Sequence, residues 1–231
     1  MDKYHPTYRF VREFLPRAEG ATGNKRYEAT FSTGRSGVSF GATQGDPRNN
    51  SRANDVLKQM LDDAVTRKEI DQAYRDRLYK FAHTDAAQRA RHQADGTWMT
   101  ADDQARFNAV LNHRKSRELI ELFDDDQAIL VANDLQSLQE RMRGRPGGAG
   151  VLAPENSDME TLGMLAAWHN RTGDLSMTQE YLMSAPGPLT ADMIRNRIAG
   201  YKQFRPVTQD GRGEDFGNWA ERIRSAVGQT R

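Results

Sequence analysis

The amino-acid sequence predicts a mainly α-helical protein with one small β-hairpin, and three observations support this fold class. Apolar residues recur at intervals of three and four over most of the 231 residues, which is the period of an amphipathic helix. Only residues 26–44 instead alternate apolar and polar side chains around glycine-rich turn residues. The chain has no cysteine, so neither disulfides nor cysteine-bound metals contribute to the fold.

The first predicted element is an amphipathic helix over residues 6–19. Its apolar residues Tyr8, Val11 and Phe14 stand at helical spacing. Pro16 lies near the end of this pattern and is expected to kink the helix or to end it early.

The predicted hairpin follows. Tyr27, Ala29 and Phe31 alternate with polar neighbours, residues 34–37 supply the turn, and residues 38–40 resume the extended pattern. This segment is the one good β signal in the sequence.

Helices are expected over the rest of the chain. They are expected from Ser51 or Asn54 to about Val65, then over residues 69–82, 101–143 (two or three helices, the last about 125–143), 159–168, 178–183, 190–204 and 216–227. Thr100 and Asp103 resemble a capping box, and the acidic run 124–126 is expected to be a solvated helix cap.

The sequence allows two interpretations of the domain organisation. The chain is expected to form one domain, which is compatible with its length. The Gly/Pro-rich segment 144–150 also allows two lobes, residues 1–143 and residues 151–231.

The charge composition limits the kinds of binding partner that are expected. Lys and Arg number 33 against 32 Asp and Glu, so no global positive field indicates a nucleic-acid partner. The first fifty residues carry eight basic and five acidic side chains, an excess of +3 that favours an anionic polymer such as a bacterial wall.

The sequence predicts neither a membrane span or secretory signal nor a metal or cofactor site. No apolar run approaches the roughly 18–20 residues of a membrane span, and the N-terminus lacks the pattern of a secretory signal. No metal site or cofactor is expected, because the five histidines show no i, i+4 pairing and no glycine loop ends in the Gly-Lys-Ser/Thr of a phosphate site.

One segment carries the residues that glycan cleavage requires. That reaction needs a carboxylic acid to protonate the leaving oxygen, usually with a second carboxylate or polar group opposite it. Glu19 falls at the predicted end of the first helix, and Glu28 follows nine residues later on the first predicted hairpin strand. Hydroxyls and an amide follow along the hairpin, from Thr33, Ser39, Thr43 and Gln44, before it closes at Asp46.

A helix ending in Glu-Gly, an acidic residue nine positions on, and a Thr/Gly-rich hairpin resemble the active-site segment of phage-type lysozymes, in which Glu, Asp and Thr occur at similar intervals. The resemblance implies a lysozyme-like α+β architecture with Glu19 as general acid. It places Glu28 where the family has Asp, and Thr33 within a residue of the family's Thr.

A second resemblance covers residues 39–46. This stretch is similar to the Gly-Phe-Gly-Leu-Met-Gln-x-Asp motif of goose-type lysozymes and lytic transglycosylases, with Ala42 and Thr43 in place of Leu-Met. Together the two resemblances cover about forty residues, and they imply that Thr43, Gln44 and Asp46 bind substrate.

The resulting hypothesis is an enzyme that cuts the β-1,4 bonds of peptidoglycan, as a muramidase or a lytic transglycosylase, with chitosan-type substrates as near neighbours. It implies action in the periplasm or at the bacterial cell wall without a signal peptide. Trp98, after the Asp95–Thr97 turn, is the best candidate for stacking on a sugar, whereas Trp168 is expected in the core.

The alternative is a non-catalytic helical module of a virion or secretion apparatus that binds glycan or a partner protein. The many charged residues and the Gly-rich segment fit it equally well. The sequence gives no indication of oligomeric state.

Overall fold

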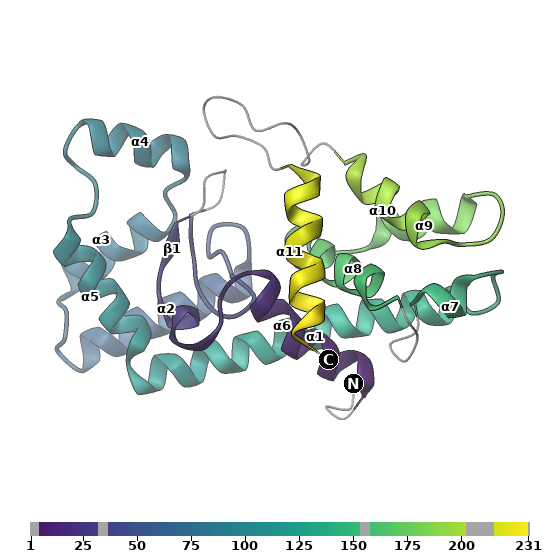
Figure 1. Cartoon of the computed structure of the whole chain (residues 1–231). Coiled ribbons are helices and arrows are strands. Elements are labelled where there is room, and N and C mark those ends of the chain that lie inside the picture. Colours follow the sequence, from purple (N-terminus) through teal and green to yellow (C-terminus); the bar gives the residue numbers. More distant parts are fainter. Residues whose placement is uncertain (1–4, 32–36, 153–157, 202–214, 231) are drawn as a thin grey trace. The chain divides into compact units, whose positions relative to one another are not determined.

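The computed structural model describes residues 5–31, 37–152, 158–201 and 215–230 (Figure 1). Within these ranges the protein is mainly helical with one two-stranded antiparallel sheet, which confirms the predicted fold class. The chain divides into two compact units, one formed by residues 1–19 with 126–231 and the other by residues 20–125.

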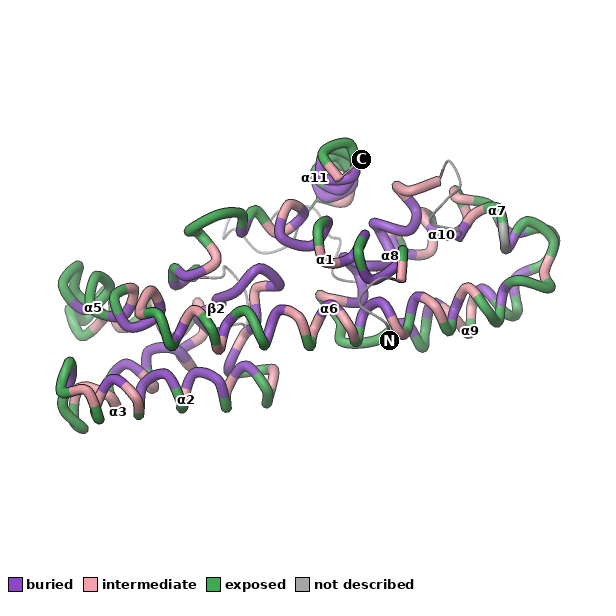
Figure 2. The backbone as a smooth tube through the Cα atoms, turned by 90° about the horizontal axis from the view of Figure 1, so that it is seen from below, coloured by how far each residue is buried: buried purple, intermediate pink, exposed green. Residues whose placement is uncertain are grey.

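The first unit is built around one buried helix. It contains α1 (Pro6–Ala18), α7 (Gly148–Leu152), α8 (Met159–Thr172), α9 (Ser176–Ser184), α10 (Ala191–Ala199) and α11 (Phe216–Gly228). α8 packs against α1, α7, α10 and α11. Residues 161–169 of α8 are all buried (Figure 2 colours the backbone by burial). Trp168 is only 3% exposed, which confirms its predicted place in the core.

The second unit has its own hydrophobic core. It contains a 3-10 helix η1 (Gly23–Tyr27), strands β1 (Thr30–Phe31) and β2 (Val38–Ser39), and the helices α2 (Ser51–Thr66), α3 (Gln72–Ala82), α4 (Ala86–Ala94) and α5 (Ala101–Asn112). α2 packs against α3 and α5, and β2 packs against α3. The core side chains are mostly large and apolar, among them Phe40, Leu57, Phe107 and Phe123.

Two helices cover residues 101–143, within the predicted two or three, but the last one is longer than the expected 125–143. α6 runs unbroken from Arg114 to Met142, so no helix begins near residue 125. The acidic run 124–126, expected to be a solvated cap, lies inside α6, and Asp124 is completely buried. Asp is a poor helix former, but tertiary contacts override so weak a preference.

The units also differ from the predicted lobes. The division falls after Glu19 and after Asp125, and residues 144–150 lie within the first unit. Part of this glycine-rich stretch is itself helical, in α7. The Arg145 guanidinium donates to the backbone carbonyls of Leu182 and Ala185, so the segment is held against the end of α9.

The predicted hairpin is shorter than its alternating pattern. β1 and β2 pair antiparallel, with Thr30 opposite Ser39 and Phe31 opposite Val38. Glu28 was expected on the first strand, but it lies before that strand as the residue that ends η1. The placement is explained by Gly23 and Asn24, which open a tight 3-10 turn, so the extended chain begins only after Glu28.

Of the local end signals, an early end at Pro16 was predicted wrongly and the capping box correctly. α1 begins at Pro6 and continues through Pro16 to Ala18, so this proline does not end the helix early. Thr100 and Asp103 form the predicted capping box of α5. Burial alone would raise the pKa of Asp103, but hydrogen bonds from Tyr74 and Thr100, together with Arg77, lower it.

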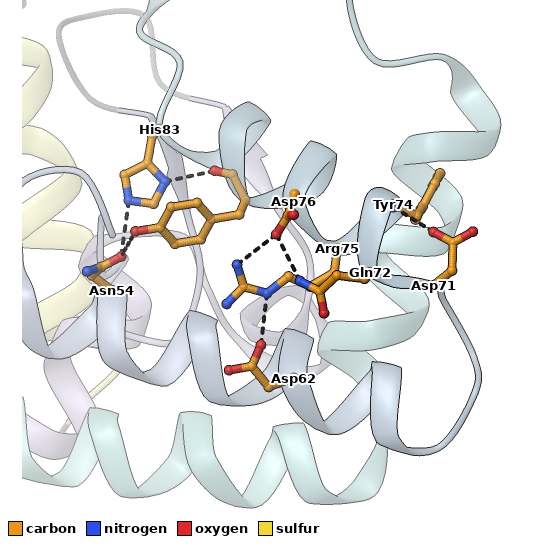
Figure 3. Close-up of polar contacts among 9 residues, drawn as sticks. Asn54, Asp62, Asp71, Gln72, Tyr74, Arg75, Asp76 and His83 are labelled. Atoms are coloured by element: carbon orange, nitrogen blue, oxygen red, sulfur yellow. Dashed lines mark hydrogen bonds and ion pairs between the residues drawn. The ribbon is translucent and has the colours of Figure 1, made fainter.

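Polar contacts join α2 and α3 over the apolar core (Figure 3). The Tyr79 hydroxyl donates to Oδ1 of Asn54 at 2.9 Å, and Nε2 of His83 lies 3.1 Å from the same oxygen. Elsewhere along the same two helices, Nε of Arg75 in α3 donates to Oδ1 of Asp62 in α2 at 2.8 Å. These contacts link side chains of the two helices and so support the packing of the second unit.

Two classes of feature are absent from the described residues. No helix among them is long and apolar enough to cross a membrane. The same residues contain no group of three or more His, Cys, Asp or Glu side chains arranged to hold a metal ion.

Candidate functional site

Glu19 is the residue that ends α1. Its backbone N–H donates to the carbonyl of Leu15 at 3.0 Å, and Gly20 then takes a left-handed φ of +69° that turns the chain out of the helix. The Glu19 side chain is half-buried, and Nδ2 of Asn170 donates to its Oε1 at 3.1 Å. The sequence-predicted acid is therefore at a helix end, in contact with an amide donor from α8.

The helix that carries Glu19 is firmly packed. Phe14 and Leu15 of α1 are fully buried in the core of the first unit. At Gly163 of α8 an added Cβ would lie 3.1 Å from the Phe14 ring, so this glycine permits the close approach of the two helices. Since α1 and α8 are held together in this way, Glu19 and Asn170 share one rigid support.

Glu28 is exposed, but the backbone on both sides of it is fixed. Before it, the Tyr27 carbonyl accepts from Nδ2 of Asn112 at 2.9 Å. The Tyr27 hydroxyl donates to Glu121 at 2.6 Å; burial and this hydrogen bond raise the pKa of Tyr27. After it, the Ala29 N–H donates to Oδ1 of Asn108 at 2.9 Å. α5 and α6 thus hold the segment while the Glu28 carboxylate faces solvent.

Residues 39–46 form a closed loop. Phe40 and Gly45 exchange two backbone hydrogen bonds, of 3.1 and 2.7 Å. Between them, Gly41 has φ +81° and Gln44 has φ +54°. Positive φ is uncommon for a residue with a side chain, and such conformations persist only where the surroundings enforce them.

The buried carboxylate of Asp124 holds this loop in its conformation. Asp124 of α6 accepts hydrogen bonds from the N–H of Ala42 at 2.8 Å, and from the N–H and the hydroxyl of Thr43, both at 3.1 Å. A Cβ on Gly41 would lie 2.7 Å from Oδ1 of Asp124. The loop is therefore wrapped around the end of one aspartate side chain.

Most of the residues predicted to bind substrate make contacts inside the protein. Ser39 and Thr43 are 7% and 6% exposed, and the Thr43 hydroxyl donates to Asp124. Asp46 accepts from the backbone of Gly37 and Arg48 and from the side chain of Asn49. These contacts give Thr43 and Asp46 roles in shaping the loop.

Gln44 and Trp98 are half-buried. Nε2 of Gln44 donates to the carbonyl of Gly41 at 3.1 Å, which closes the turn. The Trp98 ring meets Phe31 and Phe81 edge-on, with centroids 6.0 and 5.0 Å apart, and so belongs largely to the core. Its role as a sugar platform stays a prediction.

The predicted site residues fall into separate groups. Glu28, Ser39, Thr43, Gln44 and Asp46 belong to the second unit, and the last four share one loop. Glu19 belongs to the first unit. Thr33 lies outside the described residues, so its role stays a prediction.

Sequence reasoning missed the two residues that hold the candidate groups, Asp124 and Asn170. Asp124 did carry a signal: it stands four residues after Ile120 and four before Ala128, on the apolar face of α6. A polar residue on such a face needs partners when it is buried. Asn170 carried no comparable signal, because its partner is 151 residues away in the sequence.

No family model matches this chain, and comparison with curated proteins and with solved structures finds no match.

Replacing Gly41 by Ala is expected to destabilise the second unit by about 2–4 kcal/mol, because the new Cβ meets Asp124 and the left-handed φ adds strain. Gly96 provides the matched control: it has φ +66° with nothing within 4 Å of a Cβ, so Gly96→Ala adds the strain alone, about 1–2 kcal/mol. Chemical denaturation of both variants measures the difference. Equal losses would contradict the close approach at Gly41.

Proposed function

We propose that this protein is a glycoside hydrolase or lytic transglycosylase that cleaves β-1,4 bonds of peptidoglycan, with Glu19 as the general acid. The observation that carries the proposal is the setting of Glu19. It is a half-buried carboxyl at a helix end, fixed by an amide donor and followed by a left-handed glycine. The amide donor holds the carboxyl in one orientation, and a general acid needs such a fixed position within reach of the oxygen that it protonates.

The proposed reaction begins when Glu19 gives its proton to the glycosidic oxygen as the bond from that oxygen to the anomeric carbon breaks. The sugar ring left behind carries oxocarbenium-like positive charge. In hydrolysis, water adds to the anomeric carbon and loses its proton to a carboxylate, a role for which Glu28 is the candidate from the sequence resemblance alone. Glu28 suits the role of a base because its carboxylate is exposed on a backbone held at both sides.

A second outcome needs no base other than Glu19. In transglycosylation a hydroxyl of the substrate attacks the anomeric carbon, and the Glu19 carboxylate takes the proton of that hydroxyl. The product then has an internal ether bond in place of a reducing end. Gln44, held in a left-handed conformation in the loop around Asp124, stays the candidate for a sugar contact that the sequence resemblance implies.

The test is an end-group analysis. Purified protein is incubated with peptidoglycan and, in parallel, with chitosan, and soluble fragments are identified by mass spectrometry. Disaccharide fragments with reducing ends indicate a hydrolase, and anhydro ends indicate a transglycosylase. Folded protein that releases no fragment from either polymer would contradict the proposal. Co-sedimentation with peptidoglycan without cleavage would favour the non-catalytic binding module instead.

A further inference from the structure

Within the first unit, one polar contact joins the N-terminal helix to a residue 151 positions away. Nδ2 of Asn170 lies 3.1 Å from Oε1 of Glu19, with the amide as donor. Both side chains are half-buried. The contact therefore lies at the edge of the core, where a hydrogen bond to a carboxyl orients it more strongly than in bulk water.

Asn170 is itself held in place by the helix that carries it. Its neighbour His169 is buried, and Nε2 of that ring lies 2.7 Å from Oδ2 of Asp134 on α6. Two residues further on, the Thr172 hydroxyl donates to the carbonyl of Trp168. α8 ends directly afterwards at Gly173, which has φ +89°. Asn170 thus stands on the last turn of α8, directly after the buried residues 161–169.

The chemistry of an amide donor distinguishes the two oxygens of the Glu19 carboxyl. An NH₂ group only donates hydrogen bonds, so the oxygen that it meets must be an acceptor. When Glu19 is protonated, Oε1 accepts from Asn170 and the acidic hydrogen belongs on Oε2. An arginine in the same place would add a full positive charge and favour the ionised carboxylate, whereas a neutral amide orients the group with far less of that bias.

We propose that Asn170 is a positioning residue that fixes the Glu19 carboxyl and directs its acidic proton to Oε2. The expected effect on the cleavage rate rests on the proposed function, because the direction of the Glu19 proton affects that rate only if Glu19 is the general acid. The contact itself can be examined whether or not the protein cleaves glycans.

The contact is tested by NMR of the Asn170 side-chain amide in the full-length protein. In the native protein we expect its two amide protons to be well separated in chemical shift, because one of them is bonded to Glu19. Glu19→Ala is expected to reduce this separation, whereas Glu13→Ala, at an exposed position of the same helix, leaves it unchanged. An amide signal that is indifferent to Glu19→Ala would overturn the inference.

The kinetic test compares three variants on peptidoglycan. Asn170→Ala is expected to lower kcat by about 10–100-fold while KM changes by less than about two-fold, the pattern of a misplaced catalytic group. Asn170→Gln keeps the donor and is expected to recover part of that loss. Asn196→Ala is the control, an exposed asparagine of α10 in the same unit.

The outcomes separate the two proposals. Inactive native protein contradicts the proposed function, and the NMR comparison still decides the contact. Active native protein with Asn170→Ala as active as Asn196→Ala overturns the positioning role and leaves the function intact. Thermal unfolding of each variant shows whether a loss of activity reflects a loss of fold.

Discussion

Replacing Glu19 by Gln is expected to lower glycan cleavage by about 10²–10⁴-fold, the range over which a general acid contributes to a reaction. Glutamine has the shape of glutamate, and its Oε1 still accepts the hydrogen bond from Asn170, so the fold is expected to survive. What the variant loses is the acidic proton. The rate of release of soluble fragments from peptidoglycan measures the effect.

The matched control is Glu13→Gln, at an exposed position of α1 six residues earlier. It removes the same charge from the same helix, and we expect its activity to remain within about two-fold of the native rate, as for most exposed substitutions remote from a site. If the two variants are equally active, Glu19 is not the acid.

Glu28→Gln then distinguishes the two reactions. A hydrolase that uses Glu28 as the base is expected to lose most of its activity in this variant. A transglycosylase, in which Glu19 takes back the proton, is expected to retain activity and to yield the same anhydro ends. The exposed setting of Glu28 makes a large effect on folding unexpected.

The fold was predictable where local chemistry decides the structure. The capping box of Thr100 and Asp103 is set by residues three positions apart, and it forms as expected. The period of the apolar residues places α1, α2, α3 and α11 near their observed limits for the same reason. Each of these signals is contained within a few turns of chain.

Predictions were wrong where distant groups decide the structure. The run 124–126 indicates a helix end when it is considered alone, but Asp124 is buried by the loop of residues 41–43 and α6 continues through it. The predicted hairpin segment ran as far as residue 44. Instead, the pairing of β1 with β2 ends at Ser39, and the chain turns at Gly41 beside the Asp124 carboxylate.

The candidate site, like the fold, was predictable only where residues close in the sequence define it. The sequence order of Glu19, Glu28 and Gln44 was sufficient to propose the acid, the base and a substrate contact. It could not indicate Asn170, because the contact between Asn170 and Glu19 joins positions 151 residues apart. Nor could it indicate that the hydroxyl of Thr43 faces Asp124 inside the protein.

Asp124→Ala is expected to destabilise the second unit by about 3–5 kcal/mol, because three buried donors lose their acceptor. The substitution leaves the N–H groups of Ala42 and Thr43 and the Thr43 hydroxyl without the acceptor that they share. Each such loss costs about 1–3 kcal/mol when the group stays buried. The cavity left by the carboxyl adds to this, because Asp124 is 0% exposed.

The control is Glu118→Ala on the same helix, whose carboxylate is 62% exposed in an i, i+4 pair with Arg114. Surface pairs of this kind contribute about 0.5 kcal/mol or less, so the two variants differ roughly tenfold in expected effect. Chemical denaturation gives the loss of stability, and hydrogen exchange at the amides of Ala42 and Thr43 locates it. If both amides keep their protection in Asp124→Ala, the loop does not depend on the carboxylate. If protection is lost there first, one buried aspartate holds Gln44 in its left-handed conformation, and the same variant should then weaken glycan binding before it unfolds the protein.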